Sequence, residues 1–190
     1  MSKTKSVRNR RYPRRALIAV AVLAGLMFAA IFVGVRSAAQ GAPPDFAMVA
    51  YQGEERLGGD ELNFSELLGQ GEPVVLNFWA ALCPPCRQEM PGFQRIHDEL
   101  GEEFTMLGVD IGPFIGLGSH DQAREFLDEY GIDYPTAYAV SDSPVRDYQV
   151  RGMPTTIFFD GNGAIAGKHT GYLTEERLRE EIRALLVTTE

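Results

Sequence analysis

The chain has 190 residues, of which 45% are hydrophobic and 23% charged, and its formal net charge is −8. All 26 acidic residues but only ten of the 18 basic residues follow residue 40, so residues 41–190 carry a formal charge of −16. Such an acidic domain does not bind nucleic acid through a basic surface, which excludes that class of function. About 145 residues suffice for one hydrophobic core, so we expect one domain at 45–190.

The first 35 residues differ in composition from the rest. Residues 1–15 hold seven basic and no acidic side chains, and residues 16–35 form an uncharged apolar run. A helix of about 20 apolar residues crosses the hydrocarbon of a bilayer, and flanking basic residues stay in the cytoplasm. The sequence therefore predicts a basic cytoplasmic tail (1–15), a transmembrane signal-anchor (16–35) and a linker (36–44). The domain is then held at the cell membrane, outside the cytoplasm.

A cleaved secretory signal peptide is the alternative for this segment. The apolar region of a signal peptide usually spans about 7–15 residues, which is shorter than this run. The small residues of SAAQG would still offer a cleavage site near Ala39. The length of the apolar run favours the uncleaved anchor.

From residue 73 onward, apolar runs alternate with amphipathic patterns. Strands that are buried on both faces read as continuous apolar runs, and amphipathic helices repeat apolar residues every three or four positions. In chain order these patterns predict a strand at 73–80, a helix that begins at about residue 84, a strand at 104–111, a helix at 119–131, a strand at 134–140, a short helix at 143–150, a hairpin at 155–171 and a closing helix at 174–186. This order predicts an α/β fold with helices on both faces of a mixed central sheet.

Cys83 and Cys86 are the two cysteines of the chain, and they lie where the first predicted strand gives way to a helix. Pro84 and Pro85 suit a first helical turn, where a missing N–H group costs nothing. A helix N-terminus carries partial positive charge and free N–H groups, which stabilise a thiolate. The sequence therefore predicts a redox pair in which Cys83 attacks and Cys86, one turn later, resolves.

A structural disulfide and a metal site are the alternatives for this pair. A disulfide that closes so short a loop constrains the unfolded chain little. A zinc site needs more ligands than two sulfur atoms, and the three histidines, His97, His120 and His169, lack ligand spacing to the cysteines. We therefore expect neither a bound metal nor a cofactor.

Two segments resemble the signatures of one known family. NFWAALCPPCRQEMP (77–91) is similar to the active-site segment of membrane-anchored thioredoxin-like proteins of the TlpA/ResA type, which are related to the AhpC/TSA redoxins. RGMPTTIFFDGNGAIAGKHTG (151–171) resembles the second signature of these proteins. The resemblance runs from about Asp45 to Leu186 and implies a thioredoxin-like fold and extracytoplasmic thiol–disulfide oxidoreductase activity.

The resemblance also implies roles for residues of the first segment. Cys83 would be the nucleophile and Cys86 the resolving thiol. Glu89 would match an acid that the family places beneath the active site, with an exposed helical acid as the alternative. Asn77 stands where cytoplasmic thioredoxins have a buried aspartate; because an amide does not titrate, Glu89 is the better candidate for proton transfer.

Further residues are implied to contact the substrate. The Met153–Pro154 bond would be cis, with Pro154 facing the cysteines and the backbone of Met153 pairing with a substrate strand. Leu82 and Pro84 would flank the attacking sulfur atom. The family usually has Trp where this chain has Leu82, which reduces the contact surface.

The expected function is reduction of protein disulfides outside the cytoplasm. The resemblance implies apocytochrome c cysteines as a target, as in cytochrome c biogenesis, and a membrane thiol transporter as the electron donor. A peroxiredoxin-like peroxidase is one alternative, but it would have Thr at the position of Ala80. A copper-delivery protein of related fold is another, but it would have three residues between its cysteines. The loop at 112–120 is expected either to pack in the core or to border the partner-binding surface.

Overall fold

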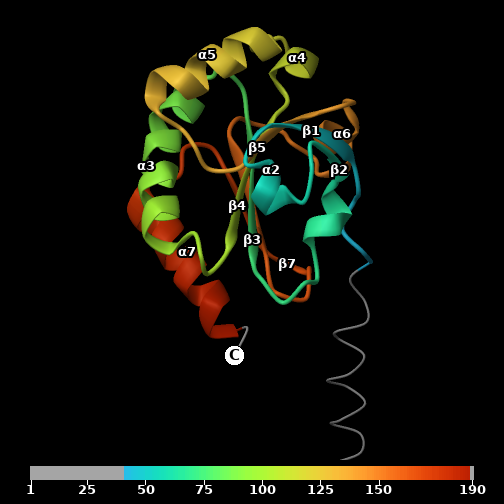
Figure 1. Ribbon diagram of the computed structural model, residues 1–190, viewed down its shortest axis with the longest axis vertical. Helices are drawn as coiled ribbons and strands as arrows, with labels where there is room; N and C mark the ends of the chain where they lie inside the picture. The colour runs from blue at the N-terminus through green and yellow to red at the C-terminus, as the bar shows by residue number, and fades with distance from the viewer. Residues whose placement is uncertain (1–40, 189–190) are drawn as a thin grey trace, which may run out of the picture. The chain divides into compact units, whose positions relative to one another are not determined.

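The computed structural model describes residues 41–188 (Figure 1). The predicted tail, the predicted anchor and the first part of the predicted linker lie outside the described residues. Within residues 41–188, no helix combines the length and the apolar character that a membrane span requires.

A seven-stranded sheet forms the centre of the domain, in the order β2-β1-β5-β4-β3-β6-β7. The parallel pairs are β3 with β4 and β4 with β5, and the other neighbours are antiparallel. The sheet is therefore mixed, as predicted. Its strands are β1 (Ala47–Gln52), β2 (Glu61–Asn63), β3 (Val74–Trp79), β4 (Thr105–Asp110), β5 (Thr136–Ala139), β6 (Thr155–Phe159) and β7 (Ile165–Thr170).

Helices cover both faces of this sheet, which confirms the predicted α/β architecture (Figure 1). They are α2 (Glu54–Leu57), the 3-10 helix η1 (Phe64–Leu67), α3 (Pro84–Leu100), α4 (Gly112–Ile115), α5 (His120–Tyr130), α6 (Ser143–Asp147) and α7 (Glu175–Thr188). One apolar core joins α3, α5 and α7 to the sheet and includes both cysteines. A second core joins α2, η1 and the segment after α6 to the other face.

The two central strands are apolar because both of their faces are covered. Every residue of β3 and of β4 is buried, which explains why their sequences are largely apolar. Because these strands are parallel and in register, their carboxyl ends, Trp79 and Asp110, lie side by side. The segment that holds the cysteines leaves the sheet at this edge.

Local hydrogen bonds confirm two predicted helix starts. The Ser119 hydroxyl accepts the Gln122 N–H at the start of α5, and Gly131 ends that helix in a left-handed conformation. The Thr174 hydroxyl accepts the Arg177 N–H at the start of α7. Pro91 lies inside α3.

Candidate redox site

The strand–helix junction holds the cysteines as the sequence predicted. Cys83 is the N-cap of α3, and Pro84 and Pro85 occupy its first turn. Cys83 and Cys86 form a disulfide, with their Cα atoms 5.3 Å apart. The Cys86 N–H donates to Cys83 Sγ at 3.3 Å, so the amide that a thiolate at position 83 needs is already in place.

Both sulfur-bearing residues are shielded from solvent in this disulfide form. Cys83 is 2% exposed and Cys86 is fully buried, whereas Pro84 between them is exposed. The disulfide is therefore almost entirely enclosed at the start of α3.

Glu89 lies in the interior one turn after Cys86, so the alternative of an exposed helical acid is wrong. The side chain is 2% exposed; its Oε1 accepts from Asn77 Nδ2 at 2.9 Å and its Oε2 from the Leu173 N–H at 2.9 Å. Burial raises the pKa of Glu89 to about 8, against the opposing effect of these two hydrogen bonds. Glu89 therefore keeps its proton at neutral pH when the cysteines are oxidised.

The predicted cis bond between Met153 and Pro154 is confirmed. Pro154 is buried, and its carbonyl accepts the Gly171 N–H at 2.8 Å. The segment that begins at Gly171 also supplies the Leu173 N–H to Glu89. Residues 171–173 therefore donate hydrogen bonds both to the Pro154 carbonyl and to the Glu89 carboxyl group. Met153 packs on the apolar core that contains the cysteines, whereas the approach of Pro154 to Cys83 stays a prediction.

The residue before the attacking cysteine is open to solvent. Leu82 is 49% exposed, and its N–H donates to the Leu117 carbonyl at 2.9 Å. Leu117 belongs to the segment that follows β4. In that segment Phe114 is 38% exposed, while Gly112 is buried. The segment after β4 thus packs in the interior at Gly112, as one of the two expectations had it, while a role in partner binding stays a prediction.

A cluster of polar side chains at the end of β4 was not predicted from the sequence. Asp110 is buried and bonds to Tyr51, which also lies next to His120. An acid at the end of the buried run FTMLGVDI was the available signal for Asp110, because charged residues are seldom fully buried unless paired. Nothing in the sequence pointed to Tyr51, which is 59 positions away.

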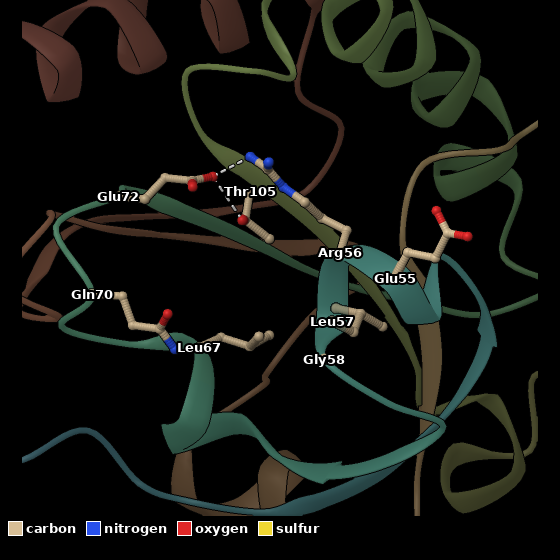
Figure 2. A pocket seen from close by; sticks show the side chains of 8 residues that line it. All are labelled: Glu55, Arg56, Leu57, Gly58, Leu67, Gln70, Glu72 and Thr105. Carbon is tan, nitrogen blue, oxygen red and sulfur yellow. Dashed lines mark hydrogen bonds and ion pairs between the residues drawn. The ribbon is translucent and has the colours of Figure 1, made fainter.

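A pocket of about 330 Å³ lies elsewhere, beside α2 and the start of β4 (Figure 2). Glu72 occupies its edge, where it pairs with Arg56 and accepts from the Thr105 hydroxyl at 2.8 Å. Thr105 is the first residue of β4, and the cysteines follow the opposite, carboxyl end of the adjacent parallel strand. The pocket therefore forms no part of the redox site.

Comparison with known proteins gives a consistent assignment. Residues 40–168 match the AhpC/TSA family. The chain is 32% identical over 177 residues to the thiol-disulfide oxidoreductase ResA of Halalkalibacterium halodurans, with 91% of this chain and 93% of the relative covered. It is 30% identical to the thioredoxin-like protein YneN of Bacillus subtilis, over 79% of this chain and 81% of that protein.

Solved structures agree in fold and in activity. A protein of Chlorobium tepidum assigned as the thiol:disulfide interchange protein DsbE has a TM-score of 0.63 and 28% identity, over 76% of this chain and 95% of that one. The exposed lipoprotein thioredoxin Etrx1 of Streptococcus pneumoniae has a TM-score of 0.60 and 25% identity, over 75% and 100%. The chain therefore belongs to the AhpC/TSA family, has the thioredoxin-like fold and is a thiol–disulfide oxidoreductase.

Proposed function

We propose that this oxidoreductase reduces disulfides of protein substrates outside the cytoplasm, with Cys83 as the attacking thiol. The Cys83 thiolate attacks one sulfur atom of a substrate disulfide, and the other substrate sulfur leaves as a thiolate that takes up a proton. Cys86 then attacks Cys83 Sγ, which releases the first substrate sulfur and forms the Cys83–Cys86 disulfide. Two electrons pass to the substrate. The observation that carries this proposal is the Cys86 N–H directed at Cys83 Sγ at the helix start.

Ionised Glu89 is proposed as the proton acceptor for the resolving thiol, so that the protonated Glu89 of the oxidised protein is the state after this transfer. Cys86 and Glu89 are three residues apart on α3, a spacing that places side chains on the same helical face, and both are buried. The pKa of Glu89, at about 8, is close to the ordinary value of about 8.5 for a thiol. A proton can therefore pass between the two groups with little cost in free energy.

Substrate contacts are proposed for the residues that surround Cys83. The exposed side chains of Leu82 and Pro84 flank the attacking sulfur atom. The backbone of Met153, before the buried Pro154, is proposed to pair with an extended substrate segment. A substrate with an accessible disulfide in a flexible segment fits these contacts, and the paired cysteines of apocytochrome c are the proposed natural target.

The location of the enzyme and its electron donor are also proposals. Residues 1–15 and 16–35 have the sequence of a basic tail and a single membrane anchor, which would hold the domain at the outer face of the membrane. A similar solved structure belongs to an exposed lipoprotein, which supports this placement. The oxidised pair would then be reduced again by a membrane thiol transporter.

The Cys86→Ser variant is expected to capture the natural substrate. Cys83 still attacks the substrate disulfide, but the serine hydroxyl does not resolve the mixed disulfide, so the complex accumulates. Expression in the native cell, alkylation on lysis and non-reducing electrophoresis with mass spectrometry identify the partner. The matched Cys83→Ser variant is expected to form none of these adducts. Adducts that persist in Cys83→Ser, or appear equally in both variants, would contradict the assigned roles.

Protease added to intact spheroplasts is expected to remove the domain from the membrane fraction. Cleavage should fall in the linker at 36–44, because this small, Pro-rich segment follows the predicted anchor. Immunoblotting against the domain before and after lysis measures the protection. Protection until lysis would contradict an outward-facing domain, and release of intact domain without protease would show that the segment near Ala39 is cleaved as a signal peptide.

A further inference from the structure

Three titratable side chains from different elements meet at the carboxyl end of β4. The Tyr51 hydroxyl, from β1, donates to Asp110 Oδ2 at 2.9 Å and lies 2.7 Å from Nδ1 of His120 at the start of α5. The same histidine nitrogen lies 3.6 Å from Asp110 Oδ2. Asp110 is 1% exposed, so its charge depends on these partners.

Further rings and one cation complete the surroundings of this cluster. The Tyr138 ring, from β5, packs on His120 with a centroid distance of 4.2 Å and on Tyr51 with 5.2 Å. Arg124 of α5 lies over the Tyr51 ring, 5.0 Å from its centroid. Tyr51 of β1 and His120 of α5 are thus the titratable groups next to the Asp110 carboxylate, and Tyr138 of β5 and Arg124 of α5 pack on these two side chains.

A continuous chain of hydrogen bonds runs from Asp110 to the redox site. Asp110 Oδ1 accepts the Gly112 N–H at 2.8 Å, and the Gly112 carbonyl accepts the Leu117 N–H at 2.9 Å. The Leu117 carbonyl in turn accepts the Leu82 N–H at 2.9 Å. Leu82 directly precedes Cys83, so the last bond fixes the backbone next to the attacking sulfur atom.

The loop and the active-site segment are also in tight contact. A Cβ atom on Gly112 would lie 2.9 Å from Asp110 Oδ1 and 3.2 Å from the Ala80 side chain. Gly118 has a φ of +125°, and a Cβ atom there would lie 3.0 Å from the Ala81 side chain. A shift of the loop therefore presses on the residues that lead to Cys83.

We propose that Asp110 is a positioning residue for protein substrates of this enzyme. Held by Tyr51 and His120, its carboxylate fixes the Gly112–Leu117 turn, and the turn sets the position of Leu82 beside Cys83. The inference rests on the proposed function, because the position of Leu82 matters to a substrate that is large enough to contact it. Asp110 acts through the loop and not on the sulfur atoms.

The charge of Asp110 makes this positioning dependent on pH. Burial raises the pKa of Asp110, while hydrogen bonds from Gly112 and Tyr51 and the charge of His120 lower it. The carboxylate therefore takes up a proton at a higher pH than an exposed aspartate does. A neutral carboxyl group is a weaker acceptor for the Gly112 N–H, so the hold on the loop weakens as the pH falls through this pKa.

The test compares a protein disulfide with a small one in single-turnover reactions of the prereduced enzyme. Insulin is the protein probe and 2-hydroxyethyl disulfide the small probe. Tyr51→Phe and Asp110→Asn are expected to lower the insulin rate about tenfold, because misplaced contacts slow productive docking, and to leave the small-disulfide rate unchanged. Tyr138→Phe is the matched control, since it removes a hydroxyl from the same ring cluster without removing a hydrogen bond to Asp110.

The pH profile separates positioning from a general structural role. In the wild type, the ratio of the insulin rate to the small-disulfide rate is expected to fall on acidification, and in Asp110→Asn it is expected to stay low and flat. Equal changes with both probes, or an unchanged ratio in both variants, would overturn the inference. If Asp110→Asn does not fold, Tyr51→Phe decides, because it removes a single oxygen atom. A wild-type enzyme that reduces the small disulfide but not insulin would instead overturn the proposed function.

Discussion

Replacing Cys83 with serine is expected to abolish disulfide reduction, lowering the single-turnover rate with insulin by about three orders of magnitude or more. Catalysis begins with attack by the Cys83 thiolate, and a serine hydroxyl in the same place is not ionised at neutral pH. The measurement follows loss of insulin disulfides by quenching and thiol labelling. The fold should persist in this variant, because serine retains an acceptor at the N-cap for the Cys86 N–H.

Cys86→Ser is the matched control for this experiment. It keeps the attacking thiol and should therefore react once, stopping at the mixed disulfide. In the reduced wild type, iodoacetamide at neutral pH should modify Cys83 well before Cys86, since Cys83 is at the helix start and its sulfur atom accepts the Cys86 N–H. A faster Cys86, or an active Cys83→Ser variant, would reverse the roles of the two thiols.

Glu89→Gln is expected to change how the stability of the oxidised protein depends on pH. The pKa of Glu89 is raised from 4.5 to about 8 by burial, so the folded protein holds a proton that the unfolded chain releases. The stabilising contribution of the protonated acid is complete below about pH 4.5 and is lost as the pH rises towards about 8, a difference of up to about 5 kcal/mol. Glutamine does not titrate in this range.

Urea unfolding of both oxidised proteins between pH 4 and 9 measures this difference. The free energy of unfolding of the wild type should decline relative to that of Glu89→Gln over this interval. The exposed acid Glu99 on the same helix gives a control, because Glu99→Gln should leave the decline intact. Parallel stability curves for wild type and Glu89→Gln would show that Glu89 ionises as an ordinary acid.

The sequence predicted the elements that are most deeply buried. β3 and β4 were recognisable because both of their faces are covered, and α5 and α7 because they carry end signals such as Ser119 and Thr174. β1 and β2 were missed: most of β1 is only partly buried, and β2 has three residues. A short or half-exposed strand produces neither a continuous apolar run nor a clear alternation.

Within the site, residues held by local contacts could be predicted from the sequence, and residues held by distant contacts could not. Cys83 and Cys86 adopt their arrangement through neighbours in sequence, so the motif alone located them. The sequence also contained a signal for the burial of Glu89, since its spacing of three residues from Cys86 and four from Phe93 places the three side chains on one helical face. The Tyr51–Asp110 hydrogen bond depends on the neighbouring positions of β1, β5 and β4 in the sheet. No local pattern specifies such a pairing.

The two outer strands influence where a partner polypeptide can attach. β2 has three residues, β7 places Lys168 on the opposite edge, and the pairing of β6 with β7 shifts register between Phe158 and Phe159. Short strands, lysine and register irregularities all discourage extension of a sheet by a foreign strand. The proposed pairing of Met153 with a substrate strand would therefore take place away from these edges, in the loop before β6.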